Sequence, residues 1–169
     1  MNTVDWSAVL EPDAPPVTAL AMPLKAARRA LAQPGTAHAD VVVRTVDARD
    51  CATTRDFHRA IATALDFPPG LVSWNVIEEY LYDLTWLPDA AGYVLALLNA
   101  ERFAAAESAS GLEILDKIFT GIADDATTNP YPMAPRRLIC QYAPGERADF
   151  AAVLGRYGID WPPTPTVDT

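Results

Sequence analysis

The sequence predicts an α/β fold: a small, mainly parallel β-sheet packed with helices. Apolar, β-branched segments of strand length alternate along the chain with amphipathic segments of helix length, which is typical of βα units. The chain has 169 residues, 50% of them hydrophobic, and this is enough for the core of one domain. Three core strands are expected, and an N-terminal segment offers a fourth.

The N-terminal part predicts a loose arm, a strand and a helix. Residues 1–16 contain three prolines and no hydrophobic periodicity, which indicates a flexible arm. Residues 17–22 (VTALAM) predict a short strand. Pro23 occupies a favourable first position for the helix expected over 24–32 (LKAARRALA). The Pro-Gly pair at 34–35 ends this helix.

The middle of the chain repeats the strand–helix pattern. Residues 41–46 (VVVRTV) predict a buried strand. Thr53 or Thr54 caps a helix that runs to about residue 65. Its apolar positions recur every four residues, at Phe57, Ile61 and Leu65. The turn sequence DFPPG over 66–70 ends the helix.

Two more strands complete the expected sheet. Residues 93–98 (YVLALL) and 137–142 (RLICQY) are predicted to be buried strands. Between them, residues 111–122 (GLEILDKIFTGI) form an amphipathic helix, followed by a polar, proline-containing loop over 124–135. Two chain-distant cysteines do not make a disulfide framework, so we expect Cys51 and Cys140 to be free buried thiols.

The elements divide the chain into three parts. After the arm over 1–16, residues 17–143 form the α/β domain, and residues 144–169 form a C-terminal helix and a proline-rich tail. The C-terminal helix is expected over 146–157. The tail from residue 161 contains three prolines, and it is expected either to be disordered or to lie along the surface, where it would cover a sheet edge.

Charge restricts the function classes. The chain has 13 basic and 22 acidic residues, for a formal net charge of −9. Such a surface repels nucleic acid and anionic membranes and attracts basic proteins. No apolar segment reaches the length of a membrane span, and Asp5 lies where a signal peptide needs positive charge. We therefore predict a cytoplasmic protein that binds neither nucleic acid nor membrane.

The helix expected over 74–84 has the most informative charge pattern. One face is apolar and predicts the contact with the core: Ile77, Tyr80, Leu81 and Leu84. The outer face has three acids, an amide and a tyrosine: Asn75, Glu78, Glu79, Tyr82 and Asp83. There is no basic residue between Arg59 and Arg102. An unpaired acidic face suits a basic partner, although a merely solvated face is the alternative.

No pattern of catalytic or metal-binding residues stands out. The two histidines, His38 and His58, have no carboxylate or cysteine at metal-ligand spacing. Phosphate-binding glycine loops and nucleophile motifs are absent from the sequence. The pair Asp124-Asp125 is expected to end a helix in solvent. We predict a protein that is not an enzyme and that needs no cofactor or metal.

Residues 66–88 (DFPPGLVSWNVIEEYLYDLTWLP) resemble the signature of the barstar family, approximately F-P-x-[YW]-[YF]-G-x-N-[LW]-D-A-L followed by D-L-S-W. The matching positions are Phe67, Pro68, Trp74, Ile77, Leu81 and the run Asp83, Leu84, Thr85 and Trp86. The chain departs from the signature at three points. It is one residue short before Trp74, Ser73 stands for the family's Asn, and Asn75 stands for its first inhibitory Asp. Glu79 stands for the second inhibitory Asp and keeps its charge.

The resemblance implies a three-layer fold and an inhibitor that covers the active site of a basic ribonuclease or related toxin with this helix. The implied partner-binding residues are Ser73, Trp74, Asn75, Glu78, Glu79, Tyr82 and Asp83. Glu79 would enter a cationic pocket of the partner. Trp74 is either an aromatic anchor or a core residue, whereas Trp86 is expected in the core. The alternative is a divergent immunity or interaction protein with a non-ribonuclease partner. Either would be a monomer when unbound.

Overall fold

A parallel sheet with strand order β2-β5-β4-β3 organises the fold. A computed structural model describes residues 3–32, 40–165 and 167–168. The strands are β2 (Val17–Ala21), β3 (Val41–Asp47), β4 (Gly92–Leu98) and β5 (Arg136–Tyr142). Every residue of the central strands β4 and β5 is buried, as expected of a parallel sheet covered on both faces. The predicted α/β class is confirmed, and the N-terminal segment supplies the fourth strand.

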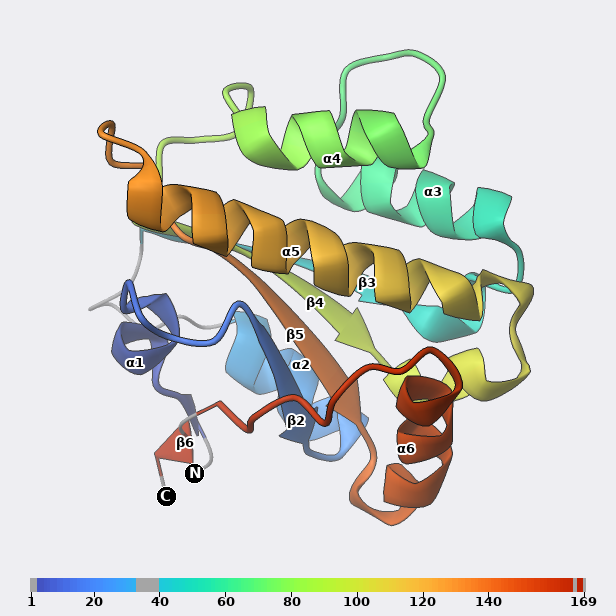
Figure 1. Ribbon diagram of the computed structural model, residues 1–169. Helices are drawn as coiled ribbons and strands as arrows, with labels where there is room; N and C mark the ends of the chain where they lie inside the picture. The colour runs from blue at the N-terminus through green and yellow to red at the C-terminus, as the bar shows by residue number, and fades with distance from the viewer. Residues whose placement is uncertain (1–2, 33–39, 166, 169) are drawn as a thin grey trace.

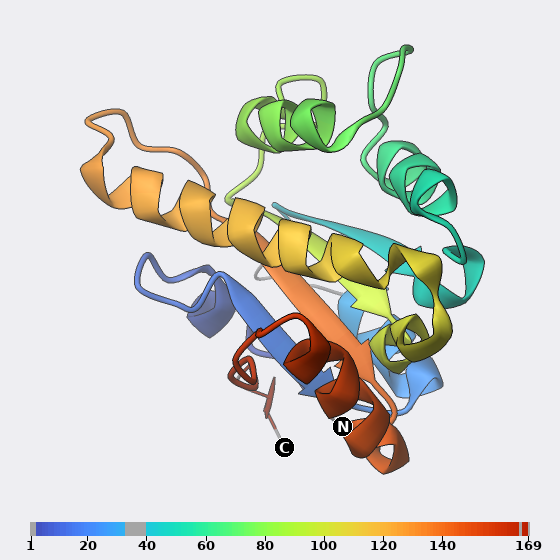
Figure 2. The same ribbon diagram turned by 45° about the vertical axis from the view of Figure 1, so that its right-hand side comes forward.

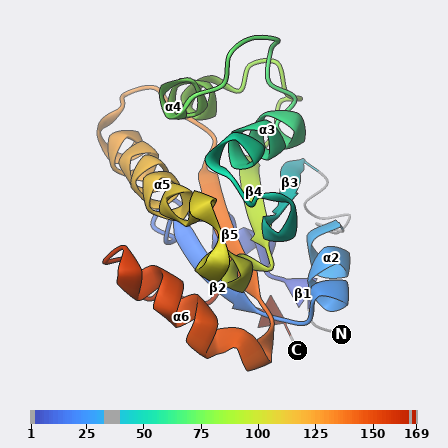
Figure 3. The same cartoon turned by 90° about the vertical axis from the view of Figure 1, so that its right-hand side faces the viewer.

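Helices cover both faces of the sheet and make three layers (Figures 1 and 3). The helices are α1 (Trp6–Leu10), α2 (Leu24–Ala32), α3 (Thr54–Ala64), α4 (Trp74–Asp83), α5 (Ser110–Thr128) and α6 (Arg147–Arg156). Alternate residues of β4 belong to two different cores. Leu95 and Leu97 pack with α3 to α6, whereas Val94 and Ala96 pack with α1 and α2.

The helix α4 lies farthest from the sheet in this arrangement. Figures 1 and 2 show it stacked over α3 and α5, and the loop that joins α3 to α4 stands clear of the other elements. The buried side chains of α4 are Ile77 and Leu81. The α4 helix therefore packs on the elements below it through Ile77 and Leu81 and exposes its opposite side to solvent.

The N-terminal segment differs from the loose arm expected over 1–16. Helix α1 forms there with Asp5 as its N-cap, and β1 (Thr3–Val4) pairs with β6 (Val167–Asp168). Trp6 and Val9 are 2% and 5% exposed and belong to the second core. Burial of these two side chains offsets the entropy of ordering a segment whose prolines alone indicated mobility.

The C-terminal segment forms the expected helix and then covers a sheet edge. Beyond α6, the indole of Trp161 packs against Tyr142 and Phe150, with ring centroids 5.6 and 5.5 Å away. The guanidinium of Arg147 lies 4.1 Å above the Trp161 ring. The amide of Ala19 in the edge strand β2 donates a hydrogen bond to the carbonyl of Pro163. The tail thus gives the edge strand β2 a main-chain partner, which blunts unwanted strand pairing.

Helix α5 is longer than its apolar pattern predicted. It continues through the polar residues Asp124 and Asp125 to Thr128, where a loop was expected. The hydroxyls of Thr127 and Thr128 donate to the carbonyls of these two aspartates, and the amide of Asn129 also donates to Asp125. Local capping therefore extends the helix past its last buried residue.

Candidate functional site

The residue before α4 is its N-cap. The Ser73 hydroxyl accepts a hydrogen bond from the amide of Val76 at 3.4 Å, and Ser73 itself has extended backbone angles. Serine and asparagine are both preferred N-caps. The structure therefore gives Ser73 a local role in starting the helix, beside the partner contact implied by the resemblance.

The acidic face predicted for α4 is exposed. The side chains of Asn75, Glu78, Glu79 and Asp83 all lie in solvent, opposite the buried Ile77 and Leu81. Among the described residues, no lysine or arginine makes an ion pair with these three carboxylates. Arg44 of β3 pairs instead with Asp66 in the nearby loop, at 3.4 Å. Among the described residues these three carboxylates therefore have no direct ion pair, although the buried guanidinium of Arg136 lies near enough to Asp83 to interact with its charge.

Tyr82 connects the acidic face to helix α5. Its hydroxyl donates a 2.6 Å hydrogen bond to the Asp125 carboxylate. This bond, together with partial burial and the charges of Asp125 and Glu78, raises the pKa of Tyr82 to about 12. The acidic surface consequently spans two helices. Sequence spacing could not reveal this contact, because the two residues are 43 positions apart.

We expect the Tyr82 titration to report this contact directly. Replacing Asp125 with alanine removes both the acceptor and the charge, so the Tyr82 pKa should fall from about 12 towards ~10, the ordinary value for tyrosine. A raised folded-state pKa means that this bond stabilises the fold fully below about pH 10 and is lost as the pH rises through 12. NMR titration of the tyrosine ring carbons, with Tyr82→Phe to assign the signal, measures the shift. An unchanged pKa in the variant would contradict the contact.

Trp74 lies between helices rather than on the acidic face. Its ring meets those of Phe57 and His58 edge-on, at centroid distances of 5.8 and 4.6 Å. A Cβ atom added at Gly111, at the start of α5, would lie 2.8 Å from the Trp74 indole. Trp74 is half-buried. Trp74 therefore packs and anchors the first turn of α4 to α3 and α5. Its contact with a partner stays a prediction.

Trp86 also packs inward, as expected. Its indole N–H donates to the carbonyl of Leu65 at 2.9 Å, and its ring contacts those of Phe67 and Tyr80. These rings hold the segments on either side of α4 together. The matched aromatic positions of the signature therefore support the acidic helix from below.

A cleft of about 890 Å³ opens beside the start of α4, between α3 and the loop over 66–72. Leu71, on the rim, is 88% exposed, which is unusual for a large apolar side chain. The sequence did not predict an exposed apolar side chain at Leu71. The DFPPG turn that precedes it is the feature that could have indicated an exposed loop at this place.

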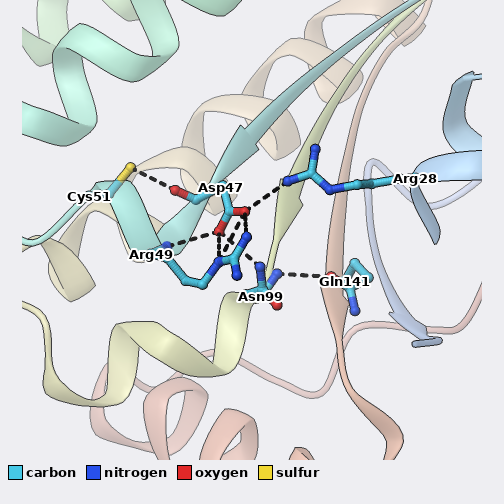
Figure 4. A network of polar contacts seen from close by, with 6 residues as sticks. All are labelled: Arg28, Asp47, Arg49, Cys51, Asn99 and Gln141. Carbon is cyan, nitrogen blue, oxygen red and sulfur yellow. Dashed lines mark hydrogen bonds and ion pairs between the residues drawn. The ribbon is translucent and has the colours of Figure 1, made fainter. Parts of the chain in front are cut away.

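The carboxyl ends of the strands, where open α/β sheets often bind ligands, are occupied by the protein's own side chains (Figure 4). Asp47 receives hydrogen bonds from Arg28, Arg49 and Asn99. Burial pushes the Asp47 pKa upwards, but the bonds from Arg49 and Asn99 outweigh it and lower this pKa to about 2. Gln141 accepts from the amide of Asn99. This network links β3, β4, β5 and α2, and we assign it a structural role.

The remaining sequence candidates form no second site. His58 packs against Trp74 with its pKa lowered by burial, and His38 lies outside the described residues. Within the described ranges, no group of three His, Cys, Asp or Glu side chains is placed to hold a metal ion. In the same ranges, no helix has the length and apolar character needed to span a membrane. Cys51 and Cys140 are buried free thiols.

Fold and surface together define a three-layer α/β protein that presents an unpaired acidic helix to solvent. The family model for barstar, the barnase inhibitor, matches residues 41–134, which is more than half of the chain. The chain therefore belongs to the barstar family. The match begins with β3 and ends just before β5, and it contains all of α3, α4 and α5.

One comparison with solved structures also bears on the fold. A chain in the "Structure of Drosophila ORC bound to AT-rich DNA and Cdc6" is similar to 95% of this chain, with a TM-score of 0.50 and 13% identity. The match spans 52% of that larger chain, so this protein corresponds to about half of it. At this identity the likeness concerns the α/β arrangement alone. No curated protein matches the sequence.

Proposed function

We propose that this protein inhibits a basic ribonuclease of the barnase type, or a related toxin, by laying α4 across its active site. Membership of the barstar family is the observation that carries the proposal. A ribonuclease active site must hold phosphate, so it concentrates positive charge. Carboxylates can replace phosphate oxygens there and accept paired hydrogen bonds from arginine.

The acidic surface has the properties that such binding requires. Its carboxylates are exposed and have no ion-pair partners among the described residues, so binding does not first break an internal salt bridge. Unpaired charge of one sign speeds encounter with an oppositely charged partner, an effect for which barnase and barstar are themselves a reference case. In this proposal Glu79 enters the cationic pocket and Asn75 adds hydrogen bonds without charge. Tyr82, which aligns Asp125 beside the helix, widens the contact to α5.

The proposal also covers catalysis, oligomeric state and compartment. The inhibitor has no catalytic role and acts as a monomer when unbound. We place it in the cytoplasm, because free thiols persist in a reducing compartment and both cysteines are free and buried. Burial raises the pKa of both cysteines to about 12, so neither thiol is poised to react.

Inhibition of purified barnase tests the proposal. We expect the wild-type protein to suppress cleavage of a fluorogenic RNA substrate stoichiometrically, and to lose affinity steeply as salt rises because the attraction is electrostatic. A protein without ribonuclease activity but of similar net charge serves as the binding control. Absence of inhibition at micromolar protein would exclude barnase as a target.

A partner other than a ribonuclease is the second candidate, and Asn75 favours it. This exposed amide stands where the family signature has an inhibitory Asp. The double variant Ser73→Asn, Asn75→Asp restores the signature, and asparagine preserves the N-cap of α4. If only the restored protein inhibits barnase, the natural chain has been redirected to another partner. Equal inhibition by both proteins supports the ribonuclease.

A further inference from the structure

Arg136, the first residue of β5, is a buried cation bonded to the last turn of α4. Arg136 is only 5% exposed. The guanidinium donates to the carbonyls of Leu81 and Tyr82 at 3.1 Å each, and more weakly to that of Asp83 at 3.5 Å. It also donates to the Ala134 carbonyl and lies 5.1 Å from the centroid of the Tyr93 ring. Carbonyl oxygens therefore take the place of the carboxylate that a buried arginine usually has.

The end of α4 needs these donors. The last carbonyls of a helix have no partner within it, and a glycine cap with basic side chains nearby usually serves them. Here the cap is Leu84, at a φ of 49°, and the last turn contains no basic residue. The Leu84 side chain is 1% exposed, so this position contributes to the core. Arg136 supplies from another element the positive charge that favours a helix C-terminus.

Arg136 is also the polar link between α4 and the sheet. Of the hydrogen bonds made by the described residues, those that join α4 to a strand all come from this side chain. The α4 helix lies outermost over the sheet (Figures 1 and 3), and Arg136 ties its last turn to β5 beneath it. Because the guanidinium is planar and rigid, three carbonyls in its reach fix both the position of the last turn and its rotation.

We propose that Arg136 is a positioning residue for the acidic face of α4. It holds the last turn so that the Glu79 and Asp83 side chains project at a fixed angle, although it touches neither carboxylate. Its hydrogen bonds go to main-chain carbonyls, so the cation steadies the helix without forming an ion pair with either acidic side chain. The effect on partner binding rests on the proposed function; the effect on α4 does not.

Arg137 provides a matched control. It is equally buried, at 4% exposed, and lies next in the chain. Its guanidinium bonds main-chain carbonyls too: those of Val9 and Glu11 at 3.0 and 2.7 Å, in and just after α1, and that of Arg136 at 3.2 Å. Replacing either arginine with methionine removes a buried cation and its hydrogen bonds. Of the two guanidiniums, only that of Arg136 bonds to α4.

Hydrogen exchange followed by mass spectrometry tests the inference without a partner. In Arg136→Met we expect amides of residues 77–84 to exchange at least ~10-fold faster than in wild type, beyond the change in the core strands, because local opening is uncoupled from global unfolding. In Arg137→Met, exchange of the α4 amides should change by no more than exchange of the amides in the core strands. Equal protection of α4 in the two variants would overturn the inference.

Binding to barnase supplies the second readout. We expect Arg136→Met to weaken affinity about tenfold and Arg137→Met less than about twofold, within the range of coupling through packed networks. Equal affinities of the two variants would overturn the positioning role. If wild type does not bind barnase, the proposed ribonuclease target fails while hydrogen exchange still decides the role of Arg136. If a methionine variant does not fold, Arg136→Lys and Arg137→Lys are compared instead, since lysine keeps the charge but loses the planar donor fork.

Discussion

Replacing Glu79 with alanine is expected to weaken binding to barnase by at least about 30-fold, the largest effect of any single change on the acidic face. Loss of one member of a buried, hydrogen-bonded charge pair typically costs ~2 kcal/mol or more, and ~1.4 kcal/mol corresponds to a factor of ten. Glu79 is exposed in the free protein and has no ion-pair partner among the described residues. The loss should therefore appear in the complex and leave the stability of the free protein almost unchanged.

Surface plasmon resonance at two salt concentrations measures this effect. Asp149→Ala is the matched control, because it removes the same charge from α6, at the opposite end of the molecule (Figure 1). It should slow association slightly by lowering net charge and should leave dissociation unchanged. Equal losses in the two variants would mean that overall acidity, and no specific carboxylate, drives binding.

Replacing Gly111 with alanine is expected to destabilise the fold by about 1–3 kcal/mol, the usual cost of overpacking a core. A Cβ at this position would lie 2.6 Å from the Phe57 ring and 2.8 Å from the Trp74 indole. The Phe57 ring is fully buried, so the clash has no open space in which to relax. Displacement of Trp74, the first residue of α4, should also lower affinity for the partner.

Gly121→Ala provides the opposite expectation in the same helix. Its new Cβ would approach nothing closer than the Tyr82 hydroxyl, at 3.9 Å, so the higher helix propensity of alanine should stabilise the protein by roughly 0.5–1 kcal/mol. Urea denaturation of both variants measures the two changes. Stabilisation by alanine at both positions would show that α5 does not approach Phe57 as closely as described.

Local periodicity determined much of this protein. The 3.6-residue repeat of α4 separates Ile77 and Leu81 from Glu78, Glu79 and Asp83 without any knowledge of the rest of the fold. Apolar runs of strand length likewise placed the four strands within a residue or two. The motif over 66–88 indicated the family, because its aromatic and leucine positions are the ones that pack beneath α4. These features depend on neighbours in sequence, which a single chain displays.

Contacts between distant residues were decided only by the tertiary structure. Proline content indicated a mobile arm at 1–16, yet the burial of Trp6 against α2 and the sheet holds helix α1 in place. Trp74 turned inward because Gly111 leaves room for its ring. Tyr82 bonds to Asp125 at a sequence separation of 43 residues, and Arg136 bonds to the last turn of α4 at a separation of more than 50. Sequence alone therefore determined which residues form the acidic face, and long-range packing determined how that face is held, because side-chain partners are chosen by proximity in the fold.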